Sequence, residues 1–157
     1  TRAADSLSIG TADIGYTGGD FSLVFETPAG TGQGSYPMLF EMGIAGTTTN
    51  RLQLYKSNSA ASASDRWYAY QNSTGIGYVT GSAGSSKVAI SYANSDLAID
   101  TDTGTIFTDT SQVVPLVDQI AIGSNDTFGS NHLNGHIKRV ALYNEALSDT
   151  NLQALTS

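Results

Sequence analysis

Apolar and polar residues alternate with a period of two along most of this chain, which is the pattern of half-buried β-strands. Phe21, Leu23 and Phe25 share one face of such a strand, and Ser22 and Val24 point to the other. Clusters of Gly, Asn, Asp and Ser separate the alternating segments and predict turns. The pattern predicts strands at residues 21–27, 38–42, 51–56, 66–71, 77–80, 87–92, 96–100, 119–122 and 137–143, with shorter pieces at residues 6–9 and 105–110.

Many short strands joined by polar loops are typical of two antiparallel sheets packed face to face, with one buried and one exposed face per strand. Residues 87–100 read as a strand, a turn at residues 93–95 and a second strand, and residues 100–104 predict another tight turn. In the last strand, Ile137 and Val140 cannot share a face without an irregularity. We therefore expect either a β-bulge there or a strand that is covered on both sides.

The end of the chain carries the one helix signal. Ser148 is a suitable N-cap, Asp149 suits the positive end of a helix, and Leu147 is placed to pack on Leu152. Leu152 and Leu155 then form one short apolar face. This pattern predicts a short C-terminal helix, which we expect to lie as a lid over the edge of the sandwich.

The composition narrows the functional classes. A chain of 157 residues predicts one domain, residues 1–157, and its net charge of −7 with only 7 Lys and Arg gives no basic stripe. We therefore expect no nucleic-acid partner and no attraction to an anionic membrane. The sequence has no Cys, which excludes disulfides, thiolate metal sites and a Cys nucleophile. No apolar run reaches the ~18 residues that a membrane span needs, so we expect no membrane insertion.

Catalysis is not indicated. Glycosidases on sandwich folds use a pair of carboxylates that reach the same cleft. Glu26 and Glu41 have no acidic residue two or four positions away along their strands, and they could meet only across strands. The sequence also lacks a nucleophile motif and a glycine-rich phosphate loop. We therefore predict no catalytic residues and a protein that is not an enzyme.

The two histidines do not form a metal site within one chain. His132 and His136 have helical spacing, but the intervening Asn-Gly pair disfavours a helix. On a strand the two rings would lie ~13 Å apart. A site shared between chains around a trimer axis remains an open alternative.

Calcium is the metal that the acidic turns could hold, because it prefers carboxylate, amide and carbonyl oxygens. Asp100 with Asp102 is one candidate set, and Asp118 with Asn125 and Asp126 is another. Neither set has the spacing of a defined calcium loop, and Asp and Asn in turns commonly bond to their own backbone. We therefore assign no metal ligand and expect no cofactor, with calcium as an open alternative.

Carbohydrate binding has the best residue support, because sugars stack on aromatic faces and hydrogen bond to amides and carboxylates. Strand alternation puts Arg66, Tyr68 and Tyr70 on one face and Trp67 on the other, so we expect one aromatic set to be exposed. On the preceding strand, Tyr55 and Gln53 would extend the exposed patch. The candidate ligand-binding residues are Tyr55, Arg66, Trp67, Tyr68 and Tyr70 on strands, and Asn125, Asp126 and His132 in loops.

The order of the last motifs resembles a known family. Gly135, an apolar strand, Tyr143-Asn144 and an Ala-Leu-Ser-Asp turn at residues 146–149 are similar to the closing segment of laminin-G-like, concanavalin A-like jelly rolls. The short helix after them is similar to those at the C-terminus of bacteriophage tail fibres. The segment at residues 119–123 and the opening residues 1–5 match the same type of domain.

This resemblance implies an all-β, two-sheet antiparallel sandwich at the C-terminus of a longer fibre protein. It also implies a virion location outside the cell, a homotrimer, and non-catalytic recognition of a polysaccharide on the bacterial surface. Two alternatives stay open. The domain could be a structural cap or trimerisation element without its own ligand, or an accessory carbohydrate-binding module of a secreted glycosidase.

Overall fold

The computed structural model describes residues 7–28, 37–44, 51–57, 66–71, 74–80, 85–102, 104–110, 116–124, 132–133 and 135–157. The elements are β1 (Leu7–Gly10), η1 (Thr11–Ile14), β2 (Phe21–Glu26), β3 (Met38–Gly43), β4 (Leu52–Ser57), β5 (Arg66–Gln71), β6 (Thr74–Thr80), β7 (Lys87–Ala93), β8 (Asp96–Thr101), β9 (Phe107–Asp109), β10 (Gln119–Ile122), β11 (Arg139–Tyr143) and α1 (Asp149–Thr156). Every predicted strand is present, as is the helix. In the described part of the chain, no helix is long and apolar enough to cross a membrane.

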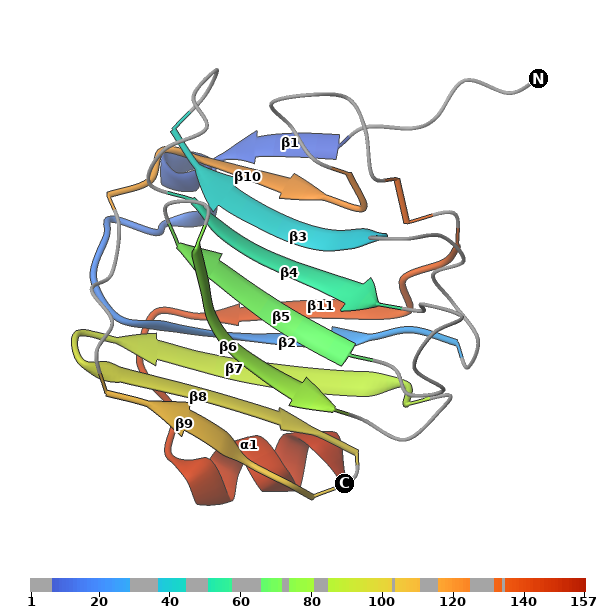
Figure 1. Ribbon diagram of the computed structural model, residues 1–157. Helices are drawn as coiled ribbons and strands as arrows, with labels where there is room; N and C mark the ends of the chain where they lie inside the picture. The colour runs from blue at the N-terminus through green and yellow to red at the C-terminus, as the bar shows by residue number, and fades with distance from the viewer. Residues whose placement is uncertain are drawn as a thin grey trace.

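The strands form two antiparallel sheets packed face to face (Figure 1). The six-stranded sheet has the order β1-β10-β3-β4-β5-β6, and the five-stranded sheet has the order β11-β2-β7-β8-β9. Strands β7 and β8 form the predicted hairpin, whose turn places Ser95 at a φ of +59°. The sheet order crosses between distant parts of the sequence, as the jelly-roll prediction requires. The predicted fold class is confirmed.

The inner faces of the two sheets form the main hydrophobic core. On β2, the predicted set Phe21, Leu23 and Phe25 points inward and is buried. The ring of Phe25 meets that of Phe40 at a centroid distance of 5.8 Å, and Phe21 stacks on Tyr92 at 5.6 Å. These contacts join β2 and β7 of one sheet to β3 of the other.

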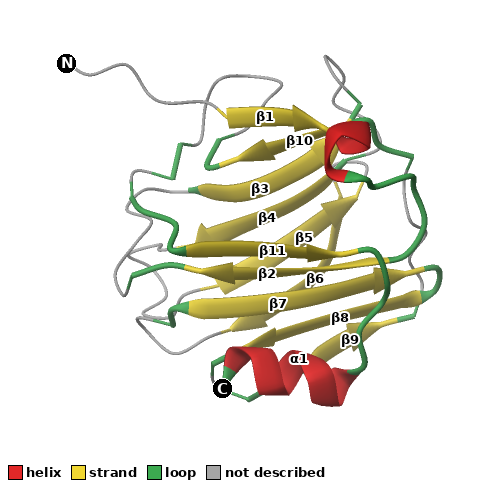
Figure 2. Ribbon diagram, turned by 180° about the vertical axis from the view of Figure 1, so that it is seen from behind, coloured by secondary structure: helices red, strands yellow, loops and turns green. Residues whose placement is uncertain are grey.

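A third layer covers the outer face of the five-stranded sheet. Figure 2 shows α1 lying across this face, and Leu152 packs there with Val24, Ala89 and Ala98. The predicted N-cap is confirmed, because the Ser148 hydroxyl accepts a hydrogen bond from the Asn151 N–H at 3.4 Å. The predicted position of the helix was wrong, since it covers a sheet face and not the sandwich edge. Alternation alone did not show that the second face of these strands is also apolar.

The irregularity predicted near the start of the last strand is present. Glu26 is the register partner of Arg139, and its carbonyl also accepts a hydrogen bond from the Lys138 N–H at 2.8 Å. Two residues of one strand therefore oppose one residue of the other, which is the arrangement of a β-bulge. The bulge lets Ile137 and Leu142 both pack on the main core.

Candidate functional site

A polar cluster occupies the outer face of the six-stranded sheet. Glu41 on β3 and Gln53 on β4 are register partners, and they alternate with the core residues Phe40 and Leu52. The Gln53 side-chain amide donates a hydrogen bond to Glu41 Oε2. Arg51, just before β4, brings its Nη1 within 3.9 Å of the same carboxylate oxygen. One carboxylate, one amide and one guanidinium therefore meet on this face.

These polar groups are largely removed from solvent. Glu41 is 3% exposed and Gln53 is 6% exposed, whereas the Arg51 side chain keeps 14% of its surface accessible. Arg51 Nε and Nη1 are buried atoms that donate no hydrogen bond within the described residues. Withdrawing a charge from water is costly unless it gains partners, so an incompletely bonded guanidinium is an unusual feature.

The aromatic residues follow the same face by register. Tyr55 on β4 pairs with Met38 on β3 and with Tyr68 on β5, and Tyr70 pairs with Gln53. Residues opposite each other in an antiparallel pair belong to the same face. The backbone therefore places Tyr68 and Tyr70 on the face of the polar cluster.

Arg66 belongs to this same face, and Trp67 belongs to the other one. The side chains of β5 and β6 lie outside the described residues. The expected exposure of Tyr55 and Gln53 was wrong, since Tyr55 is only 5% exposed. Register assigned their face correctly, but it does not report what covers that face.

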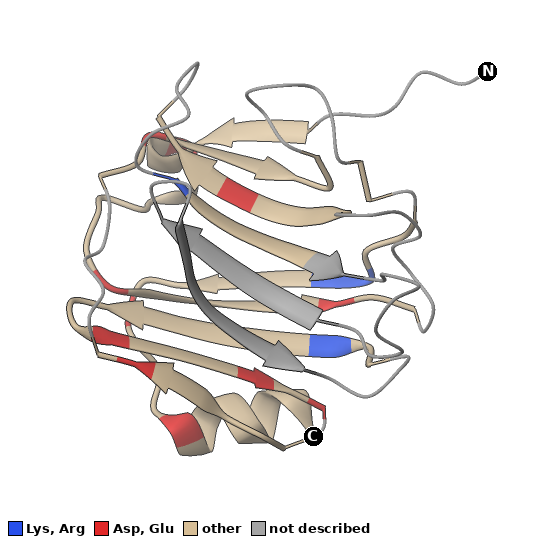
Figure 3. Cartoon of the chain, viewed as in Figure 1, with Lys and Arg blue, Asp and Glu red and all other residues tan. Residues whose placement is uncertain are grey.

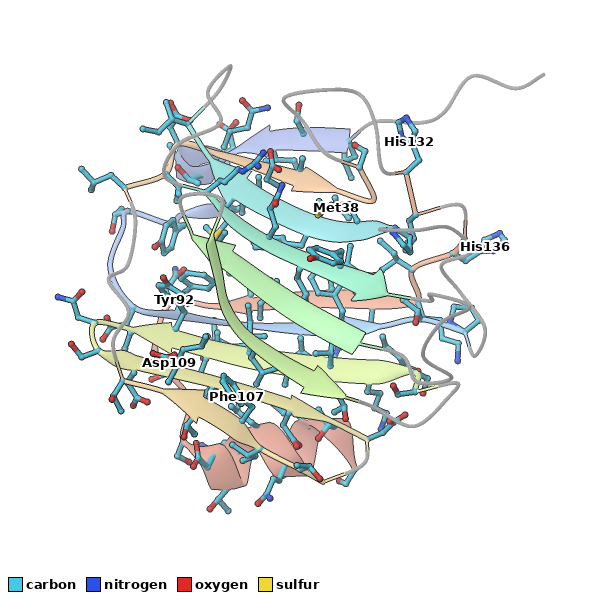
Figure 4. All side chains as sticks on the ribbon, in the orientation of Figure 1. Met38, Tyr92, Phe107, Asp109, His132 and His136 are labelled. Carbon is cyan, nitrogen blue, oxygen red and sulfur yellow. The ribbon has the colours of Figure 1, made fainter. Side chains whose placement is uncertain are left out.

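The predicted loop residues are not brought into this cluster by the described structure. Asn125 and Asp126 lie outside the described residues. His132 is partly buried, and it precedes Leu133, which is buried and whose N–H donates to the Gly123 carbonyl at 2.9 Å. Figure 4 shows His132 and His136 well apart, in agreement with the prediction that they do not share a site within one chain.

The acidic residues considered for metal binding make other contacts. Asp100 is buried, and its Oδ2 accepts a hydrogen bond from the Thr156 hydroxyl of α1 at 2.5 Å. Asp102 Oδ2 accepts a hydrogen bond from the Ser86 N–H at 2.7 Å. Among the described residues, no group of three His, Cys, Asp or Glu side chains is placed to hold a metal ion. The expectation of no resident cofactor, with calcium as the open alternative, is not tested by these contacts.

The positions of Glu26 and Glu41 do not allow the two carboxylates to act as a catalytic pair. Glu26 is on β2 and pairs with Lys138 of the β11 bulge at 3.6 Å, whereas Glu41 is on the other sheet. Since each alternates with inward-pointing core residues, the two carboxylates occupy opposite outer faces of the sandwich. They cannot serve one cleft. Figure 3 shows acidic positions on both sheets and basic positions at few places, in keeping with the net charge of −7.

Sequence reasoning missed Arg51 and gave Glu41 no binding role. The signal was available, because Glu41 is the one charged residue in the apolar strand β3. Arg51, Gln53 and Tyr55 also occupy alternate positions beside it. A charged residue inside an apolar strand marks a polar group that needs buried partners.

No protein-family model matches the chain, and no curated protein sequence matches it. Solved structures match its fold over nearly its whole length. The carbohydrate-binding module CBM40 of the Ruminococcus gnavus IT-sialidase, bound to α2,3-sialyllactose, has a TM-score of 0.69 and 17% identity, covering 99% of this chain and 97% of that chain. The NanB sialidase of Streptococcus pneumoniae has a TM-score of 0.68 and 16% identity, and the match covers 98% of this chain and 27% of NanB.

Domain 4 of AbnA, a GH43 extracellular arabinanase from Geobacillus stearothermophilus in complex with arabinotriose, has a TM-score of 0.61 and 13% identity. That match covers 89% of this chain and 68% of the other chain. At these identities the likeness establishes the fold, a jelly-roll β-sandwich shared with carbohydrate-binding modules. These structures belong to sialidases and an arabinanase, so the resemblance to phage tail-fibre domains stays a prediction.

Proposed function

We propose that this chain is a non-catalytic carbohydrate-binding module, and that it binds an acidic glycan on the outer face of the six-stranded sheet. The observation that carries this proposal is Arg51, whose side chain keeps 14% of its surface accessible and whose buried Nε and Nη1 donate no hydrogen bond within the described residues. An arginine guanidinium matches a carboxylate in a bidentate geometry. A sugar that bears a carboxylate would complete the bonding of this side chain.

The neighbouring groups have complementary roles in this proposal. Glu41 Oε2 pairs with the Arg51 guanidinium and accepts a hydrogen bond from the Gln53 amide. Carboxylate and amide oxygens also suit sugar hydroxyls, and the register places Tyr68 and Tyr70 on the same face. The sialyllactose in the R. gnavus module and the arabinotriose in the AbnA domain support a glycan ligand for this fold.

The glycosidases among these structural neighbours favour an accessory module of a glycosidase over the other functions considered. Recognition of a bacterial surface polysaccharide by a trimeric tail fibre has no support from these matches. The homotrimer, the virion location and the surface polysaccharide therefore stay predictions. A non-catalytic role agrees with the placement of Glu26 and Glu41 on opposite faces.

Calorimetric titration with sialyllactose and with lactose tests the proposal, since the two glycans differ by one acidic sugar. We expect binding of sialyllactose and a loss of at least about tenfold in affinity for Arg51→Gln, the change expected when a charge-assisted contact of about 1.4 kcal/mol is removed. Arg139→Gln removes the same charge from the exposed start of β11 on the other sheet and should bind normally. Equal binding of both glycans, or equal losses in the two variants, would contradict the proposal.

A further inference from the structure

The edge of the sandwich formed by β1 and β11 carries an apolar cleft. Its volume is about 270 Å³, and it opens between the two sheets. The cleft is lined by Ile9, Ile14, Leu23, Phe40, Ile120, Ile122, Val140, Leu142 and Asn144. Val140 and Ile14 are each 37% exposed, which is high for apolar residues next to a core. This cleft is separate from the polar cluster around Arg51.

The cleft exists because the two sheets end at different places. The five-stranded sheet ends at β11, whereas the six-stranded sheet continues through β10 to β1. Figure 2 shows β11 with β10 and β1 extending beyond it. The inward residues Ile9, Ile120 and Ile122 therefore line the cleft without a facing strand among the described residues.

The bounding strand β11 also has a free edge. In the described part of the chain it pairs only with β2. Alternate residues of an edge strand direct their N–H and C=O groups away from its one partner, where they can pair with another strand. The cleft thus combines an unpaired strand edge with apolar side chains from Val140 and Leu142.

A positively charged residue lies at the start of this strand edge. Arg139, the first residue of β11, is exposed and has no ion pair within the described residues. At the other end, the Asn144 side-chain amide donates to the Gly15 carbonyl at 3.3 Å, so the C-cap of η1 bounds the cleft there. The open length therefore runs from Arg139 to Tyr143.

We propose that this edge binds an extended segment of a partner protein, which adds to the five-stranded sheet as an antiparallel strand beside β11. Backbone hydrogen bonds would hold the segment, as in other cases of strand addition. Its residues opposite Leu142 and Val140 would be β-branched and would fill the cleft, and its residue opposite Arg139 would be acidic. The inward side of the added segment would pack on Ile9, Ile120 and Ile122 of the overhanging strands β1 and β10.

A labelled peptide with the core sequence Thr-Val-Thr-Val-Glu tests this proposal by fluorescence anisotropy and by amide mapping in NMR. We expect saturable binding, slowed hydrogen exchange at Val140 and Leu142, and weaker binding of a peptide that ends in Lys in place of Glu. The Arg139→Glu variant should reverse this preference, with about a threefold change for each peptide, as for a surface ion pair. Arg139 is exposed, so this variant should fold normally.

A matched control is Lys87→Glu, which makes the same charge change at the start of β7 in the interior of that sheet. It should leave the peptide preference unchanged. No saturable binding, shifts away from β11, or the same preference in Arg139→Glu as in the parent protein would overturn the proposal.

Discussion

Tyr92 shows how the burial of one residue couples this fold to pH. Its ring is fully buried and stacks on Phe21, which in turn meets Tyr16 edge-on at 5.7 Å. Burial raises the pKa of the Tyr92 phenol above its ordinary value, and Asp109 and then Tyr16 raise it further. The pKa of Tyr16 is also raised, first by burial and then by Asp20. Figure 4 shows Tyr92 and Asp109 on the same side of the molecule.

The sign of the pH effect follows from these raised pKa values. The folded state keeps its phenol protons to higher pH than the unfolded chain, whose tyrosines titrate near pH ~10. The stabilisation is therefore complete below pH ~10 and is lost as the pH rises above it. We expect Tyr92→Phe to reduce the loss of unfolding free energy between pH 9 and pH 11 by about 1 kcal/mol.

Urea unfolding of the parent and the variant at pH 7, 9 and 11 measures this effect. Phe keeps the stacked ring, so the comparison at pH 7 isolates the hydroxyl. Tyr16 should leave a residual slope in the variant. An unchanged slope between pH 9 and pH 11 would contradict the assignment to Tyr92.

At the residue scale, the sequence predicted side-chain faces better than burial. The alternation in β2 correctly placed Phe21, Leu23 and Phe25 in the core. It did not predict that Tyr55 is buried, because a period of two tells which residues share a face and not what covers that face. For the same reason, the contact between Arg51 and Glu41 could not be predicted from the alternation alone.

The connection from β11 to α1 depends on one buried serine of a neighbouring strand. Ser22 on β2 donates its hydroxyl to the Glu145 carbonyl at 2.9 Å and accepts from the Leu147 N–H at 2.8 Å. Ser22 is fully buried, so both backbone groups receive their hydrogen bonds from it away from water. This clamp positions the segment that leads into α1.

Ser22→Ala should therefore destabilise the protein by about 1–3 kcal/mol, since it leaves backbone polar groups without their partner. The amide of Leu147 should also exchange faster with solvent. Ser91→Ala is the matched control, because Ser91 is the register partner of Ser22 on β7 and is also buried. If the two variants lose equal stability and Leu147 exchange does not change, the clamp is not the cause.

At the element scale, local signals predicted the strands and their irregularity. The three-residue spacing of Ile137 and Val140 required the bulge at Lys138 and Arg139. Strand β6 begins at Thr74, earlier than predicted. The prediction missed its first residues because they include glycines, which have low strand propensity. The position at which α1 packs could not be predicted, since it depends on apolar residues from three different strands.

On the scale of the whole molecule, the five-stranded sheet is covered on both faces and the six-stranded sheet carries the candidate glycan site. Leu152 is fully buried between α1 and the outer face of the five-stranded sheet. Deleting most of a buried leucine side chain removes its transfer free energy and leaves a cavity. We expect Leu152→Ala to lower the free energy of unfolding by about 2–5 kcal/mol.

The architecture also predicts what Leu152→Ala should leave intact. The polar cluster is on the other sheet, so the folded variant should bind an acidic glycan with the affinity of the parent protein. Leu155→Ala is the control, because Leu155 is on the same helix but only partly buried, and its loss should cost less. Urea unfolding and glycan titration of both variants give the two readouts.

Weaker glycan binding by the folded Leu152→Ala protein would show that the α1 layer is coupled to the site across the sandwich. Equal stability losses in both variants would show that Leu152 is not the main contact between α1 and the five-stranded sheet.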